Sequence, residues 1–150
     1  MRDGRENDAR GMGELMNTQE LFIWALCVWR EAMGEGFAGM LGVAWVMENR
    51  LNSGRWGKTM HDVIEDPLQF SSMTAKGDPM TVKWPNSRCE AADLAAWQEA
   101  QRAVSAVISA GPSQDPTNGA EYYFNPEVVK PDWAAKLQLV ATIGHHEFLR

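Results

Sequence analysis

The sequence predicts a mainly helical α+β domain with a small β element late in the chain. Apolar residues recur at helical spacing in three segments before residue 111, whereas a strand pattern is found only after residue 119. A length of 150 residues fits one domain that buries its own core. Residues 1–16 are polar and glycine-rich, so we expect a mobile N-terminal segment followed by a single catalytic domain over 17–150.

Two helices are predicted in the first third of the chain. The first runs over 18–33, because Asn17 with an acid three residues later is a typical N-cap and Gly34 is a typical stop. The second covers 37–53, where apolar residues recur every three or four positions until Gly54.

The middle of the chain is predicted to be more irregular. Thr59 is a candidate cap and Pro67 a breaker, which indicates a short helix or turn between them. Segment 67–88 is rich in Ser, Pro, Gly and Thr and is expected to be an irregular loop. Segment 89–110 is alanine-rich with helical apolar spacing, so it is predicted to be the longest helix, stopped by Gly111.

The β element is predicted at the end. "DPTNG" marks turns, and "AEYYF" is typical of a strand. The tail "LQLVATIGHHEFLR" fits either a strand pair or a helix, and Ile143, Gly144 and Phe148 favour extended structure.

Composition excludes several functions. A net charge of −6 argues against a nucleic-acid binder held by counterion release. Cys27 and Cys89 lack zinc or disulfide spacing. The apolar run 21–29 is too short to cross a bilayer and is placed unlike a signal peptide, so we expect neither stable membrane insertion nor an export signal.

Other chemical motifs are weak. His145 and His146 would face opposite sides of a strand, and no H-E-x-x-H spacing is present, so we expect no metal site and no cofactor. Ser71, Ser72 and Thr74 offer hydroxyls, but no G-x-S-x-G surrounds them.

Glu31 is the main catalytic candidate. At 100° per residue it lies about 20° from Trp24 and about 40° from Cys27 around the first helix, on the same apolar face. Burial and the negative end of the helix dipole would both raise its pKa, and Arg30 would oppose this if it lay close. A protonated acid near neutral pH suits general-acid cleavage of a glycoside. Alternatively, the helix has frayed by this point and Glu31 points into water.

Glu35 follows one turn after Glu31. Acids at this spacing can share a site, or Glu35 can be solvated beyond the break at Gly34 without any relation to Glu31. The residues leave both alternatives open.

Four short motifs occur in an order that resembles a known family. "REAMGEGFAGMLGVAWVMENRL", "DPLQFSS", "DPTNGAEYYFNP" and "TIGHHEF" together resemble the SleB/CwlJ family of cell-wall hydrolases, known as spore cortex-lytic enzymes and found in phage lysis proteins. The resemblance covers roughly residues 21–150.

The resemblance implies a lysozyme-like domain that cleaves peptidoglycan glycan strands between N-acetylmuramic acid and N-acetylglucosamine, typically as a lytic transglycosylase giving 1,6-anhydro ends. It implies that Glu31 is the catalytic acid and that Glu35 lies in the cleft wall or a supporting network. The remaining residues carried over as substrate contacts are Gln69, Phe70, Ser71, Thr117, Gly119, Ala120, Tyr122, Tyr123, Asn125 and His146.

Two departures from the family pattern stand out. Met33 replaces the family's Arg, and Asn118, which tolerates left-handed turns, replaces the first glycine of a pair. We expect a monomer acting on the periplasmic or extracellular wall, made in the cytoplasm, in phage or bacterial lysis. The alternatives are a hydrolytic muramidase and a non-catalytic peptidoglycan-binding module of the same fold.

Overall fold

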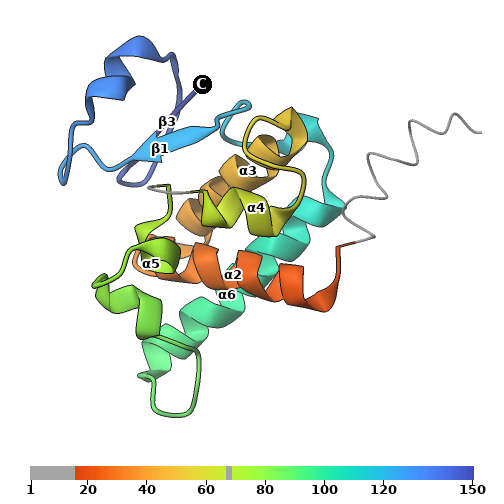
Figure 1. The fold of residues 1–150 in the computed structure, drawn as a ribbon, viewed down its shortest axis with the longest axis vertical. Helices are drawn as coiled ribbons and strands as arrows, with labels where there is room; N and C mark the ends of the chain where they lie inside the picture. The colour runs from red at the N-terminus through yellow and green to blue at the C-terminus, as the bar shows by residue number, and fades with distance from the viewer. Residues whose placement is uncertain (1–15, 67–68) are drawn as a thin grey trace, which may run out of the picture.

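The computed structural model describes residues 16–66 and 69–150 of the chain. Helices come first and a sheet comes last (Figure 1). The elements in chain order are α2 (Thr18–Ala32), α3 (Gly36–Ser53), α4 (Met60–Glu65), α5 (Ser71–Thr74), η1 (Pro79–Val82), α6 (Ala91–Ser109), η2 (Pro112–Gln114), β1 (Tyr122–Phe124), η3 (Asp132–Lys136), β2 (Leu139–Ile143) and β3 (His146–Leu149).

The first two predicted helices are confirmed, with their capping signals. The side chain of Asn17 accepts a hydrogen bond of 2.8 Å from the backbone N–H of Glu20 at the start of α2. Gly54 closes α3 in the left-handed region with φ of 72°. Of the segment predicted to be mobile, residues 1–15 lie outside the described residues. The side chain of Met16, the last residue of that segment, is buried against the core.

The middle region is more ordered than the sequence suggested. Thr59 caps α4 in a capping box with Asp62, as its position predicted, and Pro67 lies outside the described residues. The expected irregular loop contains α5 and η1, and Asp78 caps η1 by accepting a hydrogen bond from the Met80 N–H. Within this loop-like composition, the side-chain cap from Asp78 stabilises η1, whereas α5 has no side-chain cap at its N-terminus.

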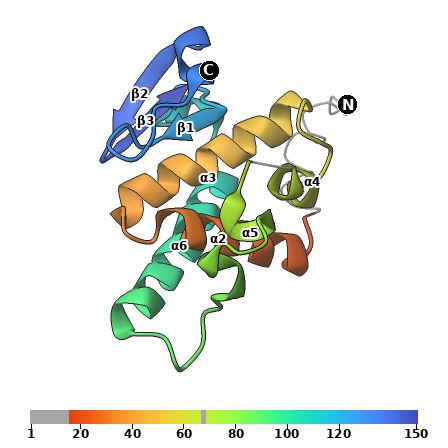
Figure 2. The same cartoon turned by 60° about the vertical axis from the view of Figure 1, so that its left-hand side comes forward.

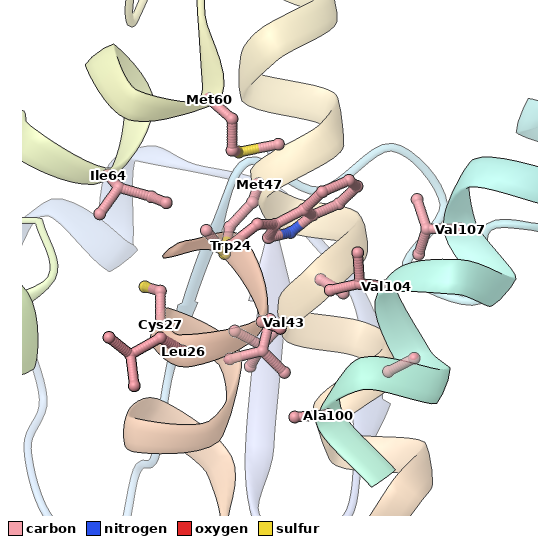
Figure 3. Close-up of a cluster of buried hydrophobic side chains, with 14 of the residues drawn as sticks. Trp24, Leu26, Cys27, Val43, Met47, Met60, Ile64, Ala100, Val104 and Val107 are labelled. Atoms are coloured by element: carbon pink, nitrogen blue, oxygen red, sulfur yellow. The ribbon is translucent and has the colours of Figure 1, made fainter. Parts of the chain in front are cut away.

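The three long helices form one hydrophobic core. α6 packs against both α2 and α3 and is the longest of the described helices, as predicted (Figures 1 and 2). Figure 3 shows Trp24 of α2 between Met47 of α3 and Val104 of α6, all buried. Full burial of side chains of this size contributes about 1.5–3 kcal/mol each to the transfer free energy. The core therefore holds the C-terminal turn of α2 rigidly in place.

The sheet packs along α3 (Figure 2). Its strand order is β1-β3-β2 with antiparallel pairing, and Tyr123 lies opposite Phe148. Gly144, with φ of 58°, makes the turn between β2 and β3. The strand pair favoured for the tail is confirmed, as is the mainly helical α+β class.

The residues the structure describes include no helix with both the length and the apolar character needed to span a bilayer.

Candidate active site

Glu31 lies in the last turn of α2, and its carboxyl is partly buried. The hydroxyl of Tyr123, on β1, donates a hydrogen bond of 2.8 Å to its Oε1. Trp24 and Cys27, which share the helix face with Glu31, are fully buried. The frayed, solvated alternative for Glu31 is therefore wrong, and the helix phase gave the correct face.

Burial raises the pKa of the Glu31 carboxyl above its ordinary value. The hydrogen bond from Tyr123 and the neighbouring Ser72 lower that pKa in part, and the negative charge of Asp78 adds to the rise. The guanidinium of Arg30, which was expected to oppose the rise if it lay close, donates to the carbonyl oxygens of Lys83 and Ser72. The direction of the predicted pKa shift is thus right, and desolvation is its main cause.

Tyr123 acts as a fixed donor to this carboxyl. Desolvation first, and the nearby charge of Glu31 second, raise the pKa of the Tyr123 phenol well above its ordinary value, so the hydroxyl keeps its proton. The ring packs against the buried rings of His146, 5.1 Å away, and Phe148, 6.0 Å away, which also contact each other. Packing from β3 therefore sets the position of the hydroxyl.

Arg30 ties the segment after α4 onto α2. Its Nε and Nη2 donate to the carbonyl oxygen of Lys83 at 3.0 and 2.8 Å, and its Nη1 donates to the carbonyl of Ser72 at 3.2 Å. The side chain is buried. Arg30 thereby holds Ser72 beside the Glu31 carboxyl.

Ser72 is the serine beside Glu31, and Ser71, which the resemblance carried over as a substrate contact, points in another direction. The Ser71 hydroxyl is exposed and donates to Asp78 at 2.9 Å. The Ser72 hydroxyl is buried, and it has no hydrogen-bond partner within the described part of the chain. Successive residues of the one-turn helix α5 point in different directions, and this could not be known without predicting that helix.

Glu35 is held at a different place from Glu31. Its Oε2 lies 3.2 Å from Nδ1 of the exposed His145, in the turn between β2 and β3. Gly36 has φ of 72° and turns the chain directly after Glu35. Glu31 and Glu35 therefore have separate partners, and the glycine-rich break between α2 and α3 is the reason.

Thr117, Gly119 and Ala120 form a turn around Asp115. The carboxylate of Asp115 accepts hydrogen bonds from the N–H and hydroxyl of Thr117, from the N–H of Gly119 and from the Asn49 amide, all at 2.7–2.9 Å. Thr117 and Ala120 are buried. The buried side chains of Thr117 and Ala120 support the chain leading into β1, while Asn118 in the same turn is exposed.

The other residues carried over from the resemblance are spread around this centre. Phe70 is fully buried and packs over Arg50, so its ring supports the site from within, while Gln69 before it is partly exposed. Asn125 is partly exposed and its side chain accepts a hydrogen bond from Glu127 N–H. His146 is buried against Tyr123.

Among the described residues, His145 and His146 belong to no cluster of metal ligands. In the residues described by the structure, no group of three or more His, Cys, Asp and Glu side chains is placed to hold a metal ion. The chemistry that the visible groups can supply is proton transfer by Glu31.

Comparison with known proteins gives consistent matches. A model of the family described as Cell Wall Hydrolase matches residues 34–149, beginning three residues after Glu31. The spore cortex-lytic enzymes of Halalkalibacterium halodurans and Bacillus subtilis are 33% and 31% identical over 129 and 132 residues, or 86% and 88% of this chain. The chain spans only 34% and 38% of those proteins' length.

Two solved structures share the fold. The catalytic domain of the germination-specific lytic transglycosylase SleB from Bacillus anthracis has a TM-score of 0.71 and 28% identity, covering 90% of this chain and 97% of that one. The SleB catalytic domain from Bacillus cereus has a TM-score of 0.70 and 28% identity, covering 89% and 91%. The chain therefore belongs to the cell wall hydrolase family, with the fold of SleB catalytic domains.

Proposed function

We propose that the chain cleaves peptidoglycan glycan strands between N-acetylmuramic acid and N-acetylglucosamine as a lytic transglycosylase. The proposal rests on Glu31, in the last turn of the buried helix α2. Burial raises the pKa of the Glu31 carboxyl, and Tyr123 orients that carboxyl. The structural neighbour from B. anthracis, a germination-specific lytic transglycosylase, supports the proposal.

In the first step, the protonated Glu31 carboxyl donates its proton to the bridging oxygen while the bond from that oxygen to C1 of muramic acid breaks. The departing chain leaves as an alcohol, and the muramic acid ring becomes oxocarbenium-like. The Tyr123 hydroxyl stabilises the carboxylate that forms, because a hydrogen bond to a charged acceptor is stronger than one to a neutral acceptor.

In the second step, the Glu31 carboxylate takes the proton from the 6-hydroxyl of the same sugar, and that oxygen bonds to C1. The product has a 1,6-anhydro ring, Glu31 is protonated again, and no water is consumed. One carboxyl suffices for this cycle, which fits the separate engagement of Glu35 with His145.

We assign supporting roles to the surrounding groups. Ser72 adjusts the basicity of Glu31, and the partly exposed Gln69, Tyr122 and Asn125 contact the sugars. His146 and the buried Phe70 hold the aromatic surroundings in place. The setting expected from the sequence, which is lysis of a bacterial wall by a phage or a bacterium, belongs to the same proposal.

Digestion of purified peptidoglycan followed by mass spectrometry of the fragments tests this function. Muropeptides with 1,6-anhydro ends are expected. Fragments with reducing muramic acid ends would show a hydrolytic muramidase, new amino termini would show a peptidase, and binding without fragments would show a non-catalytic module. Parallel digests of vegetative walls and spore cortex would separate a general lysis enzyme from a cortex-restricted one.

A further inference from the structure

Four aromatic side chains form a continuous row across the outer side of β1. Tyr122 lies between Trp56 and Trp133, with ring centroids 5.5 and 5.4 Å away, and Trp133 continues to Phe124 at 5.9 Å. We call these four residues the aromatic row. Tyr122 and Phe124 share one face of the strand, because side chains alternate along it.

A buried guanidinium backs one end of this row. Arg50 of α3 is 4% exposed and lies over the rings of Trp56 at 3.9 Å and Tyr122 at 5.5 Å. Its Nε donates to the Glu121 carbonyl at 2.7 Å, while its Nη1 has no hydrogen-bond partner among the described residues. The cation packs against the rings of Trp56 and Tyr122, and both residues remain partly exposed.

Polar groups accompany the rings at the same end. The indole N–H of Trp56 donates to Glu121 at 3.1 Å, and Arg55 pairs with the same carboxylate. A surface that presents aromatic rings together with hydrogen-bonding groups matches a sugar, whose ring has apolar C–H faces and hydroxyls at its rim. An aliphatic partner would leave these polar groups unused.

The row and the site of Glu31 are linked through Arg50, and the side chains of Tyr122 and Tyr123 point to opposite faces of β1. Tyr122 precedes Tyr123, whose hydroxyl contacts the Glu31 carboxyl. Arg50 also lies over the ring of Phe70 at 5.2 Å, so the row and the loop beside Ser72 meet at one cation. At the far end of the row, Trp133 keeps 39% of its surface exposed.

We propose that the aromatic row is a second glycan-binding surface, on which sugars of the strand distant from the cleaved bond stack, with Trp133 as its outermost platform. This rests on the proposed function. A strand long enough to reach both Glu31 and Trp133 gains affinity from the row, whereas a short fragment bound at Glu31 alone gains nothing.

The test uses binding rather than cleavage. Glu31→Gln protein is titrated calorimetrically with purified glycan fragments of alternating N-acetylglucosamine and N-acetylmuramic acid of increasing length, with and without Trp133→Leu. Leu keeps an apolar side chain against Tyr122 but removes the aromatic face. We expect roughly a three- to tenfold loss of affinity for long fragments and no change for the shortest fragment that binds.

Two further variants control this result. Trp133→Phe keeps a ring and should retain most of the affinity for long fragments. Phe22→Leu removes an aromatic ring of the same 39% exposure from α2, where it packs with Trp84 and Trp97, and should leave both affinities unchanged.

Equal affinities of Trp133→Leu and its parent for long fragments would overturn the proposal, and so would an equal loss at every length. If Trp133→Leu does not fold, Trp133→Gln takes its place at this exposed position. A loss of affinity confined to long fragments is then expected, and equal affinities or an equal loss at every length would overturn the proposal. If native protein produces anhydro ends while length has no effect on binding, the row fails and the proposed function stands.

Discussion

The Tyr123 hydroxyl donates to the Glu31 carboxyl across 92 positions of sequence. This hydrogen bond joins the end of the first long helix to the first strand of the late sheet. Because His146 and Phe148 on β3 position the Tyr123 ring, the sheet determines how the acid is oriented. The helices supply the carboxyl, and the sheet supplies its donor.

Replacing Tyr123 with Phe should slow cleavage about tenfold, because one charge-assisted hydrogen bond to the forming carboxylate is lost. The Tyr123 hydroxyl lowers the pKa of Glu31, so its loss raises that pKa further. Cleavage needs protonated Glu31 and is lost as pH rises through its pKa. The alkaline limb of the pH–rate profile should therefore move to higher pH, and a limb that moves to lower pH would contradict this arrangement.

Replacing Glu31 with Gln should change the pH dependence of stability. The folded-state pKa of Glu31 is raised above its unfolded value, so its favourable contribution is complete below the unfolded pKa and is lost as pH rises through the folded pKa. The native chain should therefore lose stability relative to Glu31→Gln over that interval. Urea unfolding of both proteins at several pH values measures the difference, and a constant difference would refute burial of the carboxyl.

Replacing Arg30 with Met should cost about 2–4 kcal/mol of unfolding free energy, since several hydrogen bonds to carbonyl oxygens are lost from a buried group. Cleavage should fall as well, because Ser72 is no longer held beside Glu31. Arg102→Met is the matched control: Arg102 is exposed and pairs with Glu99, so about 0.5 kcal/mol or less is expected. Equal losses in the two variants would remove the role given to Arg30.

Replacing Gly42 with Ala should destabilise the fold by about 1–3 kcal/mol through overpacking. A Cβ at this position of α3 would lie 2.6 Å from Cζ of the buried Phe148, so the sheet would have to shift. A Cβ on Gly111 would meet no described atom within 4 Å, and Gly111→Ala is the control. Thermal unfolding of both variants gives the comparison, and a Gly42→Ala protein as stable as the control would mean that the sheet tolerates the displacement.

Local signals explain how much of the fold the sequence predicts. Asn17, Gly54 and Thr59 act through their nearest neighbours, so helix ends can be predicted from them. Gly144, which was expected to favour extended structure, lies in the turn between β2 and β3. The burial of Met16 escapes such rules, because it depends on packing with distant residues of the core.

The site was less predictable because its contacts are long-range. Helix phase placed Glu31 on the buried face, but no local rule brings Tyr123 to it. Ser71 and Ser72 have different surroundings because α5, a short helix that the sequence did not predict, turns them in different directions. The turn around Asp115 was expected as a turn, yet the convergence of its hydrogen bonds requires Asn49 from α3.

The most direct test of Glu31 as the catalytic acid is the rate at which Glu31→Gln protein releases 1,6-anhydro muropeptides from peptidoglycan, measured by mass spectrometry against native protein. Loss of a general acid is expected to lower this rate by about 10²–10⁴-fold. Glu48→Gln is the matched control, because burial also raises the pKa of Glu48, which accepts a hydrogen bond from Asn52 on the same helix α3, and its rate should equal the native one. Release of anhydro muropeptides by Glu31→Gln at the native rate would contradict the assignment of Glu31 as the catalytic acid.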